Sequence, residues 1–195
     1  MDKIKLSSSN ENLFLSGADF AGGRKNRDII LKKSGESRRV FISLDAAAPE
    51  AISLAIRLAG RGSRAEVFIM HRGWGVARSS MRVMLSHEAE DTYARATFRS
   101  ALRDASRVDF DGMLYIAKGA DGSDSYLSAK ALMLSDKAIA RIDPKLEILA
   151  NSVKASHGAT VGRLSDQDLF YFQSRGVDRN AAERILVETF LREAM

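Results

Sequence analysis

From Ile29 onward, short apolar runs follow one another, and no convincing helix separates them before Ser165. Each run is about four to eight residues long, and many alternate apolar with polar side chains, as strands with one buried face do. Folds built from βαβ units need a helix between successive strands, so this pattern excludes them. The runs are 28–31, 40–44, 52–58, 65–70, 81–85, 93–99, 108–110, 113–116, 131–134 and 146–149.

Glycines fall mostly between these runs or at their edges, where a chain of short strands has to turn. They are Gly60, Gly62, Gly73, Gly75, Gly112, Gly119, Gly122 and Gly158. Two mainly β architectures fit the pattern: an antiparallel sandwich or barrel, and a β-solenoid in which each strand stacks on the previous coil. The sequence has no strict repeat of fixed length, so the pattern alone leaves both open.

The C-terminal residues have helical signals instead. Ser165 is a predicted N-cap, Gly176 is placed for a left-handed C-cap, and Asp178 is a second N-cap. A predicted apolar stripe follows, consisting of Ala181, Ala182, Ile185, Leu186, Thr189 and Phe190. We therefore divide the chain into a flexible or reduced leader (1–28), a β core (29–164) and a C-terminal helical subdomain (165–195).

Composition narrows the function. The 195 residues include no cysteine, which excludes disulfides, thiolate metal sites and a cysteine nucleophile. The polar start, 1–17, lacks the apolar core of a signal peptide, and no apolar run approaches the ~20 residues of a membrane span, so we expect a cytoplasmic location and no membrane partner. The sequence has no phosphate-binding loop and no diagnostic catalytic constellation, so we expect no enzyme activity and assign no catalytic residue.

The net charge of +5 originates in one segment, 24–39, which holds seven basic and two acidic residues. Such a patch could attract nucleic acid. The segment has no aromatic residue on which a base could stack, so we interpret it as a solvated, flexible lead-in and consider a nucleic-acid partner unlikely.

His157 is one of three histidines and stands where small residues and Gly158 suggest the end of a strand and a tight corner before the helix at Ser165. Imidazole binds iron and titrates near neutral pH, so His157 is a candidate ligand or proton carrier. A histidine hydrogen-bonded at a corner is the structural alternative. His71 and His87 have no metal-ligand spacing and are interpreted as surface or packing residues.

Several motifs in order resemble one family. Residues 155–164 read ASHGATVGRL and are followed by Asp168-Leu-Phe-Tyr171 and Ser174-Arg-Gly176. Upstream stand Asp124-Ser-Tyr126, the run from Ala131 to Ala138, and Pro144-Lys-Leu-Glu-Ile148. Together they are similar to the SufB/SufD family of iron–sulfur cluster assembly scaffolds over roughly 29–195, and the wording around His157 is closer to SufD. Ala155 stands where many SufD proteins have cysteine.

The resemblance implies a right-handed parallel β-helix with a small C-terminal helical subdomain. It also implies a non-catalytic scaffold that assembles with a SufC-type ABC ATPase, and with a SufB-type partner or a second copy of itself through the β-helix. His157 would contact iron or a cluster in transfer. The ATPase would dock on Leu169, Phe170, Tyr171, Arg175 and Gly176. Because the chain has no thiolate, we expect no stably bound cofactor, and only a transient iron or cluster with a partner.

Three alternatives are weighed against this reading. A homodimeric β-helix could be a binding or structural module with no role in cluster chemistry. A β-helix enzyme acting on polysaccharide needs paired carboxylates in a groove, and the sequence shows no privileged pair. A nucleic-acid binder would depend on the basic segment 24–39.

Overall fold

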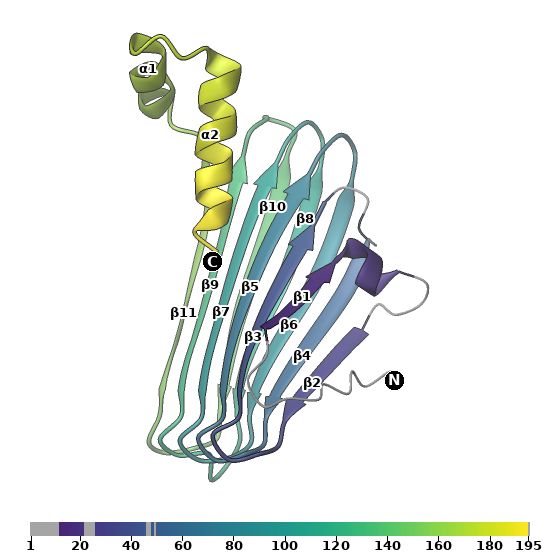
Figure 1. Cartoon of the computed structure of the whole chain (residues 1–195), viewed down its shortest axis with the longest axis vertical. Coiled ribbons are helices and arrows are strands. Elements are labelled where there is room, and N and C mark those ends of the chain that lie inside the picture. Colours follow the sequence, from purple (N-terminus) through teal and green to yellow (C-terminus); the bar gives the residue numbers. More distant parts are fainter. Residues whose placement is uncertain (1–11, 22–25, 46–47, 49, 195) are drawn as a thin grey trace.

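In the computed structural model, which describes residues 12–21, 26–45, 48 and 50–194, the chain forms a parallel β-solenoid followed by two helices (Figure 1). The elements are β1 (Asn12–Ser16), η1 (Gly17–Phe20), β2 (Asn26–Leu31), β3 (Ser37–Leu44), β4 (Ala51–Leu58), β5 (Arg64–Gly73), β6 (Arg78–His87), β7 (Tyr93–Leu102), β8 (Arg107–Ile116), β9 (Asp124–Met133), β10 (Ile139–Ile148), β11 (Lys154–Arg163), α1 (Asp166–Ser174) and α2 (Arg179–Arg192).

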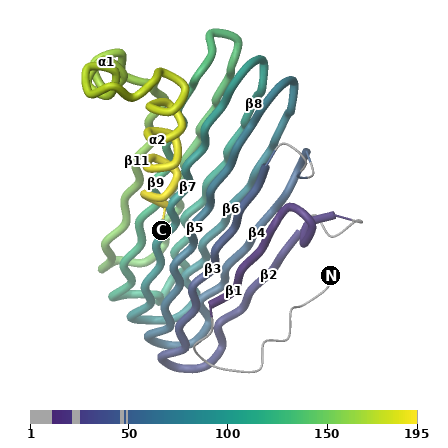
Figure 2. The backbone as a smooth tube through the Cα atoms, turned by 45° about the horizontal axis from the view of Figure 1, so that its top comes forward, coloured from purple at the N-terminus to yellow at the C-terminus, as the bar shows by residue number. Residues whose placement is uncertain are grey.

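The strands form two sheets. Sheet A has the order β1-β3-β5-β7-β9-β11 and sheet B the order β10-β8-β6-β4-β2, and the paired strands are parallel in both. Because consecutive strands alternate between the sheets, two strands make one coil, and the coils stack side by side (Figure 2). The structure thus selects the solenoid over the sandwich and confirms the predicted mainly β fold with C-terminal helices.

The coils differ in length, which explains why no fixed repeat is visible in the sequence. Ser37 pairs in register with Arg64, which lies 27 residues later, whereas Arg107 pairs with Ile139, which lies 32 residues later. The strands stay in register despite these differences in coil length. Side chains at corresponding positions of successive strands in a sheet therefore stack in rows along the solenoid. One inward row is made of Val40, Val67, Ala96 and Leu127, all almost fully buried.

Alternation within each strand builds the core between the sheets. In β5 every second residue from Ala65 to Gly73 is buried, and β8 repeats the pattern from Val108 to Ile116. Across the interior, the rings of Phe98 and Phe110 stack with centroids 4.2 Å apart. Burial of these apolar faces is the main stabilising term, and each coil supplies it for its neighbours.

Two glycines predicted at corners lie inside strands. Gly112 is in the middle of β8, so the runs 108–110 and 113–116 are one strand, and Gly158 is in the middle of β11. A Cβ at Gly112 would lie 2.6 Å from Cδ1 of Leu127, so this position has no room for a side chain. Position 112 therefore requires glycine because of close packing inside the solenoid, and it does not form a turn.

The basic segment 24–39 is not a flexible lead-in over its described part, 26–39. It forms β2, a turn and the start of β3, and strand alternation sends Arg27 and Arg38 to the buried side. Arg39 is outward and pairs with Glu66 at 2.7 Å. Arg24 and Lys25 lie outside the described residues. The same holds for 1–11 of the predicted leader, whereas Asn12–Ser16 form β1 and pair with β3, so the solenoid includes residues before Ile29.

The helix caps are as predicted, whereas the apolar stripe of α2 is confirmed only in part: Ala182 is buried and Phe190 packs against sheet A. The Ser165 Oγ accepts from the Asp168 amide at 3.2 Å, and Gly176 has φ +81°. On α2 the buried residues are Ala182, Val187 and Leu191, whereas Ile185 of the predicted stripe is 46% exposed. The buried side of the helix includes Val187 and Leu191 because these residues pack against the outer face of sheet A at Ala101.

Candidate functional site

The last coil, β10 and β11, is open on one side in the described structure. Each strand is at the edge of its sheet, and no residue of either strand is buried. Large apolar side chains at this end are 38 to 51% exposed; they are Ile139, Leu146, Ile148, Leu149 and Val161. Unpaired strand edges together with exposed apolar groups are features of an interaction surface. We call it the open end.

His157 lies on this open end and not at a corner. It is in register with Leu127 of β9, which is 1% exposed, and partners in a parallel pair point to the same side of the sheet. His157 therefore continues an inward row of core residues, and it is exposed because no further described coil covers it. The predicted tight corner is wrong, since β11 runs on to Arg163.

His157 alone cannot make a metal centre within the described part of the chain. No group of three or more histidine, aspartate or glutamate side chains is placed to hold a metal ion there. One imidazole supplies one ligand, and iron or an iron–sulfur cluster requires several. Any metal cargo at His157 would therefore need further ligands from outside the described residues.

The helix α1 presents a small aromatic surface. Leu169 is buried, whereas Phe170 is 71% and Tyr171 58% exposed. The guanidinium of Arg175 lies over the Tyr171 ring, 5.5 Å from its centroid. Gly176 then turns the chain, and its amide donates to the Gln173 carbonyl at 3.0 Å. Two exposed rings and a cation on one short helix are typical of a protein-binding surface.

The helix α2 fixes this subdomain to sheet A, a role that the sequence did not indicate. Val187 and Leu191 pack with Ala101 of β7, and Arg72 of β5 donates two hydrogen bonds to Glu188, at 2.9 and 3.0 Å. Arg103 also pairs with Glu183. Figure 1 shows α2 alongside sheet A and α1 projecting past the strand ends. None of the helices among the described residues is long and apolar enough to cross a membrane.

The candidate residues form two separate groups. Leu169, Phe170, Tyr171, Arg175 and Gly176 lie together on and just after α1. His157 lies six residues before the end of β11, which at about 3.3 Å per residue places it roughly 20 Å along the strand from Arg163. One ligand of modest size cannot touch both groups, so the open end and α1 are described as two surfaces.

The other two histidines are packing residues, as predicted. Nδ1 of His71 lies 2.9 Å from Oγ of Ser100, and Nδ1 of His87 lies 2.7 Å from Oγ1 of Thr92. Burial lowers the pKa of each imidazole to about 4 because the charged form loses its hydration. Both therefore stay neutral at physiological pH.

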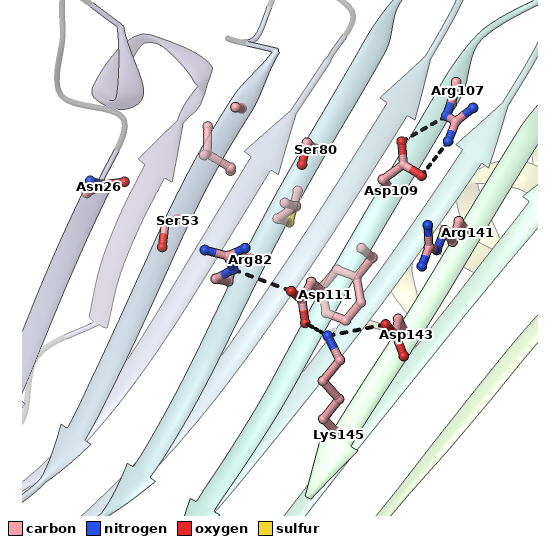
Figure 3. A pocket seen from close by; sticks show the side chains of 14 residues that line it. Asn26, Ser53, Ser80, Arg82, Arg107, Asp109, Asp111, Arg141, Asp143 and Lys145 are labelled. Carbon is pink, nitrogen blue, oxygen red and sulfur yellow. Dashed lines mark hydrogen bonds and ion pairs between the residues drawn. The ribbon is translucent and has the colours of Figure 1, made fainter.

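A groove on the outer face of sheet B brings Asp109, Asp111 and Asp143 together (Figure 3). Hydrogen bonds from Arg107 to Asp109 and from Lys145 to Asp111 hold the pKa of both carboxyls below their usual range. A glycosidase needs a carboxyl with a raised pKa as general acid. This arrangement argues against the polysaccharide-cleaving alternative. The spacing Asp109-x-Asp111 in one strand was the available sequence signal.

Comparison with known proteins gives the family. Residues 24–190 match the family model described as the SUF system FeS cluster assembly, SufBD core domain. The chain is 33% identical over 112 residues to the iron–sulfur cluster assembly protein SufD of Escherichia coli, covering 57% of this chain and 26% of that protein. It is 32% identical over 135 residues to SufD of Bacillus subtilis, covering 68% and 27%.

The similarity extends to SufB. Identity to the iron–sulfur cluster assembly protein SufB of Bacillus subtilis is 26% over 140 residues, covering 72% of this chain and 27% of that protein. Identity is thus lower than to the two SufD proteins, which agrees with the SufD-like wording around His157. The chain spans about a quarter of the length of these relatives.

Proposed function

Because the chain belongs to the SufBD family of iron–sulfur cluster assembly proteins, we propose that it is a non-catalytic scaffold subunit with two docking surfaces. The open end would receive a second β-solenoid, either a SufB-type protein or another copy of this chain. The surface of α1 would receive a SufC-type ATPase. The observation that supports this proposal most directly is the open end itself, with β11 at its edge.

A second solenoid suits the open end for two reasons. The edge strands β10 and β11 offer backbone hydrogen-bonding groups that another edge strand can use. The exposed apolar side chains Leu146, Ile148 and Val161 lie at the same end and need apolar cover. Another β edge of similar width would satisfy both needs at once.

In this assembly His157 would face the partner and act on the cargo. Its row position directs the side chain into the junction of the two solenoids, and the partner would supply the remaining ligands for iron or a cluster. The chain has no cysteine, so the thiolates would have to be the partner's. We therefore propose that His157 is one ligand or proton carrier in a site completed by another chain.

The ATPase surface is tested by co-purification. We expect the double variant Phe170→Ser/Tyr171→Ser to lose a co-expressed SufC-type ATPase, because the exposed rings supply the apolar contact. The matched control is Phe14→Ser, since Phe14 is also 71% exposed but lies on β1, the first strand of sheet A. Equal recovery of the ATPase with both variants would contradict docking on α1.

The second solenoid is tested separately. Val161→Lys should place a charge at the open end and lower the sedimentation coefficient of the complex with a SufB-type partner, or of a homodimer. Val76→Lys is the control, because Val76 is 81% exposed in a turn outside the open end. Unchanged assembly in both variants would count against the open end as an interface.

A homodimeric module without cluster chemistry is the second candidate, favoured by the fact that the open end of one copy offers the same kind of edge to another. The two candidates differ at His157. If the chain takes part in cluster assembly, His157→Ala should lower the activity of iron–sulfur enzymes in cells, with assembly of the complex intact. If the chain is a homodimeric module without a role in cluster chemistry, His157→Ala should leave that enzyme activity unchanged.

A further inference from the structure

The groove on the outer face of sheet B reaches the open end, because Arg141, Asp143 and Lys145 of β10 line it, but it lies on the outer face of the sheet and not along the edge of β10. Its volume is about 790 Å³, and a second hollow of about 480 Å³ adjoins it and shares Ser80, Arg107 and Asp109 as lining residues. The groove forms because small side chains on β4 and β6, such as Ser53 and Ser80, lie in register with long ones on the next strands. Its size is that of a small-molecule site.

Register assembles the groove in two rows. Ser53, Arg82, Asp111 and Asp143 form one row across β4, β6, β8 and β10. Ser80, Asp109 and Arg141 form the next row. Figure 3 shows Arg82 and Arg141 on opposite sides of the β8 aspartates.

The carboxylates of the groove already have partners. Asp109 accepts hydrogen bonds from Arg107 at 2.8 and 2.9 Å, and Lys145 lies 2.9 Å from Asp111 and 3.2 Å from Asp143. The pKa of Asp109 and of Asp111 is lowered by these hydrogen bonds, so both are ionised and paired at neutral pH. The groove therefore has little capacity left to attract a cation.

Donors are left over instead. Arg141 and Arg78 make no hydrogen bond with any described residue; Arg141 acts on Asp109 only through its charge, and the hydroxyls of Ser53 and Ser80 have no described partner. Arg82 reaches Asp111 only through Nε at 3.4 Å, which leaves its two terminal nitrogens available. The unmet hydrogen-bonding capacity of the groove is thus that of donors, most of them guanidinium groups.

We propose that this groove binds a small phosphate-bearing anion, with Arg141 and Arg82 as charged donors and the hydroxyls of Ser53 and Ser80 as neutral ones. Guanidinium groups pair with phosphate oxygens through two hydrogen bonds each, and hydroxyls serve the oxygens that remain. The lining extends from β4 to β10, so the groove has room for a ligand longer than a single phosphate, such as pyrophosphate or a nucleotide. The proposal uses outward side chains of β10 and not its edge, so it stands or fails separately from docking at the open end.

The test is calorimetric titration of the full chain with inorganic pyrophosphate at constant ionic strength. We expect saturable binding that weakens at least about tenfold in Arg141→Gln, the loss of one charge-assisted contact. Arg184→Gln is the control, because Arg184 is exposed on α2, away from the groove, and carries the same charge. A parallel titration with ADP shows whether the site takes nucleotides, by binding more tightly than pyrophosphate, or the phosphate chemistry alone.

A variant that is expected to strengthen pyrophosphate binding makes the test sharper. Asp109→Asn removes a negative charge and releases Arg107, so it should tighten pyrophosphate binding by a few-fold. Thermal melting of each variant establishes that it is folded. Absence of saturable binding by the folded wild-type chain overturns the proposal. Equal weakening by Arg141→Gln and Arg184→Gln also overturns it, because attraction would then reflect net charge only.

Discussion

At the scale of single residues, the two buried histidines make the fold sensitive to acid. His71 and His87 have a pKa of about 4 when folded, against 6.5 as the ordinary value. The unfolded chain therefore binds these protons first as pH falls. Stability should be complete above about pH 6.5 and decline between pH 6.5 and pH 4, by at most roughly 3 kcal/mol per histidine.

Urea unfolding at about pH 7 and pH 5 measures this decline as a lower midpoint at pH 5. His157→Ala should keep the full difference, because it leaves the two buried imidazoles of His71 and His87 in place. A midpoint that does not move between the two pH values would show that the interior accepts the charged imidazoles.

Two glycines allow a second prediction at this scale. At Gly60 a Cβ would lie 2.2 Å from the carbonyl oxygen of Lys33, which is backbone, whereas at Gly112 the nearest atom is the flexible end of Leu127. Gly112→Ala should cost about 1–3 kcal/mol through overpacking, and Gly60→Ala should cost more, since a backbone atom cannot rotate away. Chemical denaturation of the two variants gives the order, and the reverse order would contradict the steric reading.

At the scale of elements, α2 depends on a small apolar contact supported by ion pairs. Leu191→Ala should remove buried contact with β7 and cost about 2–5 kcal/mol of docking and folding free energy. Trp74 reports the change, because Arg103 lies over its ring at 5.8 Å and pairs with Glu183 on α2. We expect altered tryptophan fluorescence in Leu191→Ala and little change in Ile185→Ala, whose side chain is half exposed. The same fluorescence in both variants would contradict docking through Leu191.

Element boundaries that depend on local chemistry could be predicted from the sequence, and those that depend on packing could not. Ser165, Gly176 and Asp178 act through hydrogen bonds to residues two or three positions away, so their cap roles are visible locally. Gly112 looks like a corner glycine but is required by Leu127, a residue of the next strand in the chain. The buried face of α2 likewise depends on Ala101, which lies far away in sequence.

At the scale of the whole molecule, protection against hydrogen exchange should follow position along the solenoid. The middle strands β6, β7 and β8 have coils on both sides, whereas β10 and β11 have one neighbouring strand each. Since each coil is stabilised by its neighbours, amides of β10 and β11 should exchange faster than those of β7 in the isolated chain. Adding a partner should slow β11 selectively. Equal protection of β7 and β11 in a monomer would contradict this.

The positions of His157 and of the groove residues follow from the register between paired strands, and this register cannot be seen in a single sequence. The family motifs predicted His157 and the α1 residues as candidates, and the solenoid followed from the same resemblance and is confirmed. His157 continues the row of Leu127 because β11 pairs with β9 at an offset of thirty residues. The offsets between earlier strand pairs differ from thirty, so they could not be used to predict this pairing. The groove on sheet B was missed for the same reason, because its rows join Arg82, Asp111 and Asp143 across three coils.

The unequal coil lengths imply where this chain can tolerate insertions and deletions. Offsets between register partners change from 27 to 32 residues, yet every strand keeps its inward and outward faces, so the turns absorb the difference. One residue added within a strand would exchange its two faces and expose the core row. Length variation among related chains should therefore collect at the bends, where a loop can grow to serve a new partner without disturbing the interior.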